Sequence, residues 1–154
     1  MKKHILGVIG GLGPAATTRF MELVIEMTDA SSDQENVDMI VYNFPSIPDR
    51  TGYILGCNLK SPLPGLLSVG QALARQGADC VAIPCMTAHY FYPQLSVGIP
   101  IPVINAIDET SAHLKGPGVT RAGILGTDGT VQSGIFSRSL RAAGIVMFWR
   151  MVRF

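Results

Sequence analysis

Short, nearly continuous apolar runs alternate along the chain with stretches of helical periodicity. Runs of this kind predict strands that are covered on both faces, and they occupy residues 4–9, 37–44, 80–84 and 102–105. Helical patterns lie between them and after them, at residues 14–27, 64–76, around 90–95 and at 108–115. Because strands and helices alternate, the sequence predicts an α/β fold with a parallel sheet in three layers.

The segment Gly116-Pro117-Gly118 predicts a boundary after this first pattern. Beyond it the pattern begins again, with a strand at residues 122–125, a glycine-bearing turn, a helix to Ala143 and a strand at 145–148. We therefore expect a first α/β domain over residues 1–115 and the beginning of a second, similar and incomplete domain over residues 119–154.

Composition restricts the class of protein. The chain has 154 residues, of which 47% are hydrophobic and 15% charged, which is typical of a globular domain. A net charge of +1 without a basic stripe argues against nucleic acid as a partner. No apolar run approaches the roughly 18 residues of a membrane span, and glycines and Pro14 interrupt the signal-like start, so we expect a cytoplasmic protein without a membrane contact.

Four segments are expected at the carboxyl edge of the sheets, where open parallel sheets bind ligands. They are the turn at residues 10–14, the loop at 46–50, residues 85–89 and residues 127–130. Their shared location is the main structural argument for one functional site.

The first of these segments, Gly11-Leu12-Gly13-Pro14-Ala15-Ala16, loosely fits a dinucleotide-binding pattern. Such a site also needs an acidic residue at the end of the second strand, but that end is Tyr42-Asn43-Phe44-Pro45. We favour a carboxylate or similar anion held by the turn amides at a helix N-terminus. A plain tight turn is the next alternative, and a dinucleotide site the weakest.

Cys85 is the candidate nucleophile or base. It follows Pro84 at the end of a predicted strand and precedes a helix, where backbone amides favour a thiolate. A thiolate can abstract an acidic proton from carbon. The alternative is a buried structural cysteine, an interpretation that suits Cys80 better, while Cys57 is placed in a loop without a role. The three cysteines lack metal spacing and predict reduced thiols, with no metal site.

Polar residues around Cys85 have two interpretations each. His89 lies four residues further on and either polarises the site or caps and packs. Thr87 offers a hydroxyl to a carboxylate or serves as a helix cap, and Thr127 and Thr130 offer the same choice in the second repeat.

Arg50 belongs to the segment Ser46-Ile47-Pro48-Asp49-Arg50-Thr51, which we expect to form a long loop through Gly56. Its guanidinium can grip a carboxylate through two parallel hydrogen bonds. The alternative is a solvated loop arginine paired with Asp49.

Four ordered motifs resemble those of the aspartate/glutamate racemase family. They are Ile9-Gly10-Gly11-Leu12-Gly13-Pro14-Ala15-Ala16-Thr17, Ser46-Ile47-Pro48-Asp49-Arg50-Thr51, Pro84-Cys85-Met86-Thr87-Ala88-His89 and Gly123-Ile124-Leu125-Gly126-Thr127-Asp128-Gly129-Thr130. The resemblance covers about residues 4 to 146. It implies two similar α/β domains and racemisation of an acidic amino acid at Cα without pyridoxal phosphate, metal or other cofactor. We also expect a homodimer, because an incomplete second domain leaves an exposed sheet edge.

The resemblance also implies roles for individual residues. Two opposed cysteines, one from each domain, act as base and acid in this family, and Cys85 would be the first of the pair. The carboxylates of the substrate would be held by Arg50, Thr87 and Thr127 with the turn at Gly11 and Leu12; Met86 would contact the substrate, with His89 and Thr130 in support.

Two departures from the family pattern stand out. Met86 replaces the usual asparagine, which removes a hydrogen bond to substrate and alters the preference. The second cysteine would lie beyond residue 154, and residues 149–154 carry no turn or cap, as in a chain cut off or altered there. The alternatives are therefore an impaired racemase, a non-catalytic anion-binding remnant of the same fold and, less favoured, a nucleotide-dependent oxidoreductase.

Overall fold

The computed structural model describes residues 3–149, which group into two compact units. Unit 1 comprises residues 3–47, 63–85 and 93–104, and unit 2 comprises residues 48–62, 86–92 and 105–149. Each unit is built from separate stretches of chain. The single boundary predicted between residues 115 and 119 does not coincide with this division and stays a prediction.

Unit 1 is built on a parallel sheet, which confirms the predicted α/β class. Its strands are β1 (Ile5–Gly10), β2 (Asp38–Asn43) and β3 (Cys80–Ala82), in the order β2-β1-β3. Leu6 of β1 lies beside Met39 on one side and Cys80 on the other. All three strands run in the same direction, so their carboxyl ends share one edge.

The fourth predicted strand, at residues 102–105, is reduced to one residue. Val103 forms a single parallel bridge with Val81. The N–H of Val81 donates to Pro102 O, and the C=O of Val81 accepts from Ile104 N. Pro100 and Pro102 have no N–H to donate, so a longer ladder cannot form here.

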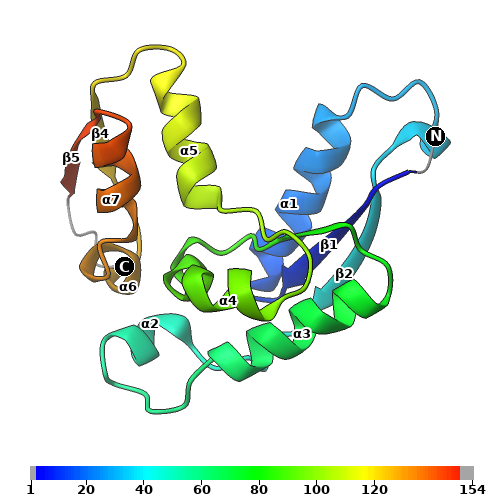
Figure 1. Ribbon diagram of the computed structural model, residues 1–154, viewed down its shortest axis with the longest axis horizontal. Helices are drawn as coiled ribbons and strands as arrows, with labels where there is room; N and C mark the ends of the chain where they lie inside the picture. The colour runs from blue at the N-terminus through cyan, green and yellow to red at the C-terminus, as the bar shows by residue number, and fades with distance from the viewer. Residues whose placement is uncertain (1–2, 150–154) are drawn as a thin grey trace. The chain divides into compact units, whose positions relative to one another are not determined.

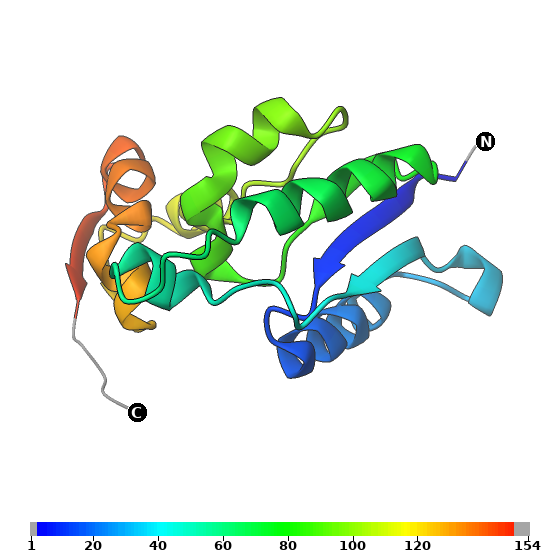
Figure 2. The same ribbon diagram turned by 90° about the horizontal axis from the view of Figure 1, so that it is seen from below.

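Helices cover both faces of this sheet. Figure 2 shows α1 (Pro14–Met27) and α3 (Leu63–Arg75) on opposite sides of the strands. A short 3-10 turn, η1 (Asp33–Glu35), precedes β2, and α4 (Tyr92–Gly98) follows β3. The core of the unit includes fully buried apolar side chains from β1, α3, β3 and α4: Val8, Ile9, Leu66, Leu73, Val81 and Leu95.

Unit 2 contains a second parallel pair of strands, β4 (Arg121–Ile124) and β5 (Val146–Trp149), with Arg121 beside Val146. Its helical segments are α2 (Arg50–Ile54), η2 (Met86–Phe91), α5 (Ala106–Lys115), α6 (Asp128–Gln132) and α7 (Ile135–Ala142). Figure 1 shows α5 beside α7, and their side chains enclose the core residues Ile107, Phe136, Leu140 and Ile145. The predicted strand–turn–helix–strand pattern after the Gly116-Pro117-Gly118 segment is confirmed.

Three predicted elements differ from the structure. The predicted loop after Pro45 contains α2, which Asp49 caps by accepting the N–H of Gly52. The helix predicted to run to Ala143 is two helices, because Gly134 has a φ of +61° and breaks the turn. The short helix predicted around residues 90–95 begins earlier, as η2, and continues into α4.

One face of the second sheet is open. Ala122, Ile124 and Met147 pack against the core of unit 2. On the opposite face, Val146 and Phe148 are 63% and 53% exposed. Among the described residues, no helix is long and apolar enough to cross a membrane.

Candidate functional site

The turn between β1 and α1 is closed by hydrogen bonds within unit 1. Gly11 has a φ of +88°, and a side chain there would collide with the backbone of Phe44. The buried hydroxyl of Thr17 accepts from Gly11 N at 2.9 Å and donates to Gly13 O at 3.1 Å. The amide of Gly11, expected to face an anion, is therefore already bonded, and Leu12 is buried.

Cys85 follows the carboxyl end of β3, at the same edge of the sheet as the Gly11 turn. The register that places Leu6 beside Cys80 would, if continued past the strands, place Gly11 beside Cys85. The thiol residue is half-buried, its N–H donates to Ile83 O at 2.7 Å, and η2 begins at the next residue. The sequence predicted this position for Cys85, and its catalytic role stays a prediction.

The other two cysteines have different surroundings. Cys80 lies within β3, where desolvation and then the charge of Asp79 raise the pKa of its thiol. Cys57 is exposed in the loop after α2. A thiol with a raised pKa is protonated at neutral pH and is a poor nucleophile.

Three threonine hydroxyls meet in unit 2, and we call Thr87, Thr127 and Thr130 the hydroxyl cluster. Thr87 Oγ1 lies 2.8 Å from Thr130 Oγ1 and 3.1 Å from Thr127 Oγ1, and the last two are 3.1 Å apart. Thr87 and Thr130 are buried, while Thr127 is exposed and caps α6. The cluster joins η2 to the first turn of α6.

The hydrogen-bonding capacity of this cluster is not exhausted. Thr127 Oγ1 accepts from Thr130 N at 3.3 Å and from Thr51 Oγ1 at 3.4 Å, which uses both of its lone pairs. Its own hydrogen can go to Thr87 or to Thr130 but not to both. One hydroxyl hydrogen, on Thr87 or Thr130, thus has no acceptor inside the cluster and can serve an oxygen of a ligand.

Helix α2 brings Arg50 and Thr51 to the same unit. The Nη1 group of Arg50 donates to Pro48 O at 3.3 Å, and the side chain is half-buried. Asp49 caps the helix by accepting from Gly52 N. Thr51, which sequence reasoning did not select, donates to Thr127; its only signal was a hydroxyl directly after the candidate arginine.

His89 and Met86 lie on η2 with Thr87. Nε2 of the buried His89 accepts from the N–H of Ala106, the first residue of α5, at 3.2 Å. This contact favours the capping interpretation of His89 over a polarising one. Met86 is 38% exposed and its side chain offers no strong hydrogen bond.

The predicted site residues thus fall into two groups. Unit 1 holds Gly11, Leu12 and Cys85; unit 2 holds Arg50, Met86, Thr87, His89, Thr127 and Thr130. Within unit 2, the three hydroxyls are in direct contact and α2 is linked to them through Thr51. Among residues 3–149, no group of three or more His, Cys, Asp or Glu side chains could hold a metal ion.

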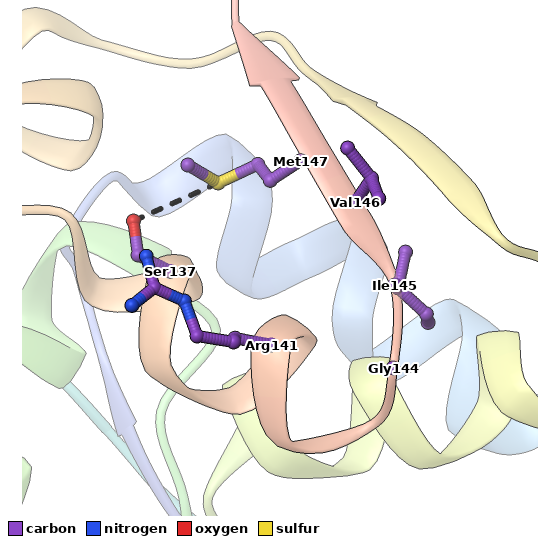
Figure 3. A pocket seen from close by; sticks show the side chains of 6 residues that line it. All are labelled: Ser137, Arg141, Gly144, Ile145, Val146 and Met147. Carbon is purple, nitrogen blue, oxygen red and sulfur yellow. Dashed lines mark hydrogen bonds between the residues drawn. The ribbon is translucent and has the colours of Figure 1, made fainter.

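A separate cavity lies between α7 and β5 (Figure 3), with a volume of about 420 Å³. Its lining is Ser137, Arg141, Gly144, Ile145, Val146 and Met147. The hydroxyl of Ser137 donates to Met147 Sδ at 3.8 Å across it. None of the predicted site residues lines this cavity, so we do not assign the site to it.

Solved structures share this fold. The chain resembles the aspartate racemase of Picrophilus torridus with a TM-score of 0.88 and 35% identity, over 95% of this chain and 62% of that one. An aspartate racemase homologue from Pyrococcus horikoshii OT3 has a TM-score of 0.77 at 23% identity, over 97% of this chain and 65% of that one, a likeness of fold alone.

Sequence comparison gives the same family. The chain is 28% identical over 144 residues to the broad specificity amino-acid racemase RacX of Bacillus subtilis (strain 168), covering 91% of this chain and 62% of RacX. It thus spans less than two thirds of the length of these relatives. The family described as Asp/Glu/Hydantoin racemase matches residues 9–153. The chain therefore belongs to the Asp/Glu/hydantoin racemase family.

Proposed function

We propose that this chain binds an acidic amino acid and removes its α-proton with Cys85, as one half of the chemistry of a cofactor-independent racemase. The observation that carries the proposal is the spare hydroxyl hydrogen of the hydroxyl cluster, which begins two residues after Cys85 in the chain. The proposal names a substrate class, a base and the groups that hold the carboxylates.

The carboxylates of the substrate are held by groups of unit 2. A carboxylate accepts hydrogen bonds only, so it can accept the one hydroxyl hydrogen that has no acceptor inside the cluster. The guanidinium of Arg50, on the helix bonded to the cluster through Thr51, supplies the positive charge and the planar geometry that a carboxylate prefers.

Proton removal is assigned to the thiolate of Cys85. The Cα–H bond breaks, an S–H bond forms on Cys85, and the electron pair passes into the α-carboxylate, which develops negative charge. Donors to this carboxylate therefore bind the carbanion more strongly than the substrate. Thr87, whose hydroxyl belongs to the cluster, follows Cys85 by two residues in the chain.

The substrate is aspartate or glutamate in this proposal. One solved relative is named an aspartate racemase and RacX a broad specificity amino-acid racemase. The thioether of Met86 accepts hydrogen bonds only weakly. We expect it to loosen discrimination between the two acids.

Inversion requires a second base on the opposite face of the substrate. The cysteines of the 154 residues are Cys57, Cys80 and Cys85; Cys57 is exposed in a loop and Cys80 is part of β3. A single thiol returns the proton to the face from which it took it. These residues alone should therefore exchange the α-proton with solvent and racemise poorly.

The test is to incubate the purified chain with L-aspartate and with L-glutamate in D2O. Loss of the Cα–H signal is followed by NMR, and the D-isomer by chiral chromatography. Cys85→Ala is compared with Cys57→Ala, a matched removal of an exposed thiol with no assigned role. We expect exchange without inversion in the parent chain and in Cys57→Ala, and a loss of orders of magnitude in Cys85→Ala.

The other outcomes are equally informative. Carboxylate binding without exchange would replace the proposal with the anion-binding remnant. If the chain neither binds the amino acids nor exchanges their α-protons, both the proposal and the anion-binding alternative are rejected. Rapid formation of the D-isomer, abolished by Cys85→Ala, would show that a second base is supplied by Cys57, His89 or another subunit.

A further inference from the structure

His89 links η2 to the start of α5 through one atom. The residue is 4% exposed, and its Nε2 accepts from the N–H of Ala106 at 3.2 Å. Ala106 is the first residue of α5, and the first four amides of a helix have no acceptor within the helix. The imidazole therefore supplies the acceptor that this amide needs.

The neighbouring amide, that of Ile107, is bonded by the residue directly before α5. Asn105 caps the helix, with its Oδ1 accepting from Ile107 N at 3.2 Å and its Nδ2 donating to Asp108 Oδ2 at 2.6 Å. The amide of Ala106 is thus bonded by His89 of η2, and the amide of Ile107 by the helix cap Asn105. The bond from His89 ties this helix start to η2.

The direction of this bond fixes the chemical state of the ring. An acceptor nitrogen carries a lone pair, so the neutral ring must bear its hydrogen on Nδ1. While this bond is made, Nε2 carries no hydrogen and the ring hydrogen lies on Nδ1.

We infer that His89 is a positioning residue of the proposed racemase site: through Nε2 it fixes η2 on the start of α5 and so holds Thr87 within the hydroxyl cluster. The inference rests on the proposed function for its consequence but not for its geometry. Because Nε2 is bonded to a backbone amide, it does not exchange a proton with substrate.

The state of the ring can be measured in the unmodified chain. Histidines labelled with nitrogen-15 show by NMR which ring nitrogen carries the hydrogen. We expect His89 to have its hydrogen on Nδ1 and a bare Nε2 at neutral pH, while the exposed His4 and His113 report the behaviour of solvated rings in the same spectrum. A hydrogen on Nε2 of His89 would overturn the inference.

Two substitutions separate positioning from mere packing. In His89→Gln the side-chain oxygen can reach the place of Nε2, whereas in His89→Asn the shorter side chain cannot. We expect the Kd for L-aspartate, from NMR titration, to rise about tenfold in His89→Asn and by less than about threefold in His89→Gln, since small displacements of a binding group are costly. Equal losses in the two variants would contradict the role.

A second measurement keeps this inference separate from the proposed function. If the parent chain neither binds acidic amino acids nor exchanges their α-protons, the proposed function fails. The methyl shift of Thr87 and the hydrogen-exchange protection of the Ala106 amide still report the linkage. Both should stay at the parent values in His89→Gln and change in His89→Asn; no difference between the variants would reject the linkage itself.

Discussion

The first strand-to-helix turn of unit 1 and that of unit 2 use threonine hydroxyls in different ways. In unit 1, Thr17 accepts from Gly11 N and donates to Gly13 O, so its hydroxyl is committed to the backbone on both sides. In unit 2, the hydroxyl of Thr127 accepts from Thr130 N, but the other hydrogen bonds of the Thr127 and Thr130 hydroxyls are with hydroxyls. One threonine completes a turn, while the others form a set of exchangeable donors.

The difference shows where a ligand can be bound without breaking the structure. Backbone groups bonded by Thr17 need that hydroxyl at all times, because a buried amide without a partner is costly. Hydroxyls bonded to one another can rotate toward an incoming oxygen at little cost. We therefore place carboxylate binding at the hydroxyl cluster of unit 2 and a structural role at Thr17.

The largest expected effect tests the ligand-binding half of this comparison. Thr87→Val keeps the shape of the side chain and removes the donor, so we expect the rate of α-proton exchange on L-aspartate to fall by about a hundredfold. Thr110→Val is the matched control, because Thr110 lies exposed on α5 with its hydroxyl bonded to Ala106 O. Similar exchange rates in the two variants would show that the hydroxyl cluster does not bind the substrate.

The free energy of unfolding tests the structural role assigned to Thr17. In Thr17→Val the buried amide of Gly11 loses its acceptor, and the free energy of unfolding should fall by about 1–3 kcal/mol in urea titrations. Thr18→Val makes the same change at an exposed residue, whose hydroxyl bonds only to Pro14 O of its own helix. If both variants unfold at the same urea concentration, the hydroxyl of Thr17 does not stabilise this turn.

A smaller effect tests the packing that brings α2 to the hydroxyl cluster. A Cβ at Gly129 would lie 3.0 Å from both Cα and Oγ1 of Thr51, so Gly129→Ala should lower the free energy of unfolding by about 1 kcal/mol. Gly116→Ala is the control: at this C-cap of α5 a Cβ would lie 3.4 Å from His113 O, an ordinary contact, so the free energy of unfolding should change by less. Equal changes in the two variants would mean that α2 is not held close to α6.

The smallest expected difference extends the comparison to thiols within unit 1. Burial and Asp79 raise the pKa of Cys80, so at neutral pH it stays protonated and its alkylation should speed up only as the pH rises. Cys85, half-buried after the strand, should react with iodoacetamide several-fold faster near pH 7. Peptide mapping by mass spectrometry measures both rates, and faster labelling of Cys80 would argue against Cys85 as the reactive thiol.

Local patterns predicted the fold best where elements are long. The helix expected at residues 14–27 has these bounds in the structure, because Pro14 suits a first turn and the apolar spacing covers almost four turns. Helix α2 was missed because five residues that include Gly52 give no periodicity, and Pro48 and Gly56 frame them as a loop.

In the candidate site, too, local sequence could not predict contacts between residues that are distant in the chain. Thr87, Thr127 and Thr130 were each selected from local sequence, but their contacts span up to 43 residues and arise from the packing of η2 on α6. Thr51, 76 residues from Thr127, could not be chosen locally. The assignment of these residues to a catalytic site stays a prediction.

The order in which the chain leaves the ribosome matters for unit 2, because residues 48–62 and 86–92 are made well before residues 105–149. Until Thr127 and Thr130 have been synthesised, α2 and η2 lack the partners that hold them, whereas the strands of unit 1 can already pair. Contacts between such distant positions form late in folding. Completion of the carboxylate-binding groups should therefore be among the last steps of folding, and no single cut in the chain can release either unit intact.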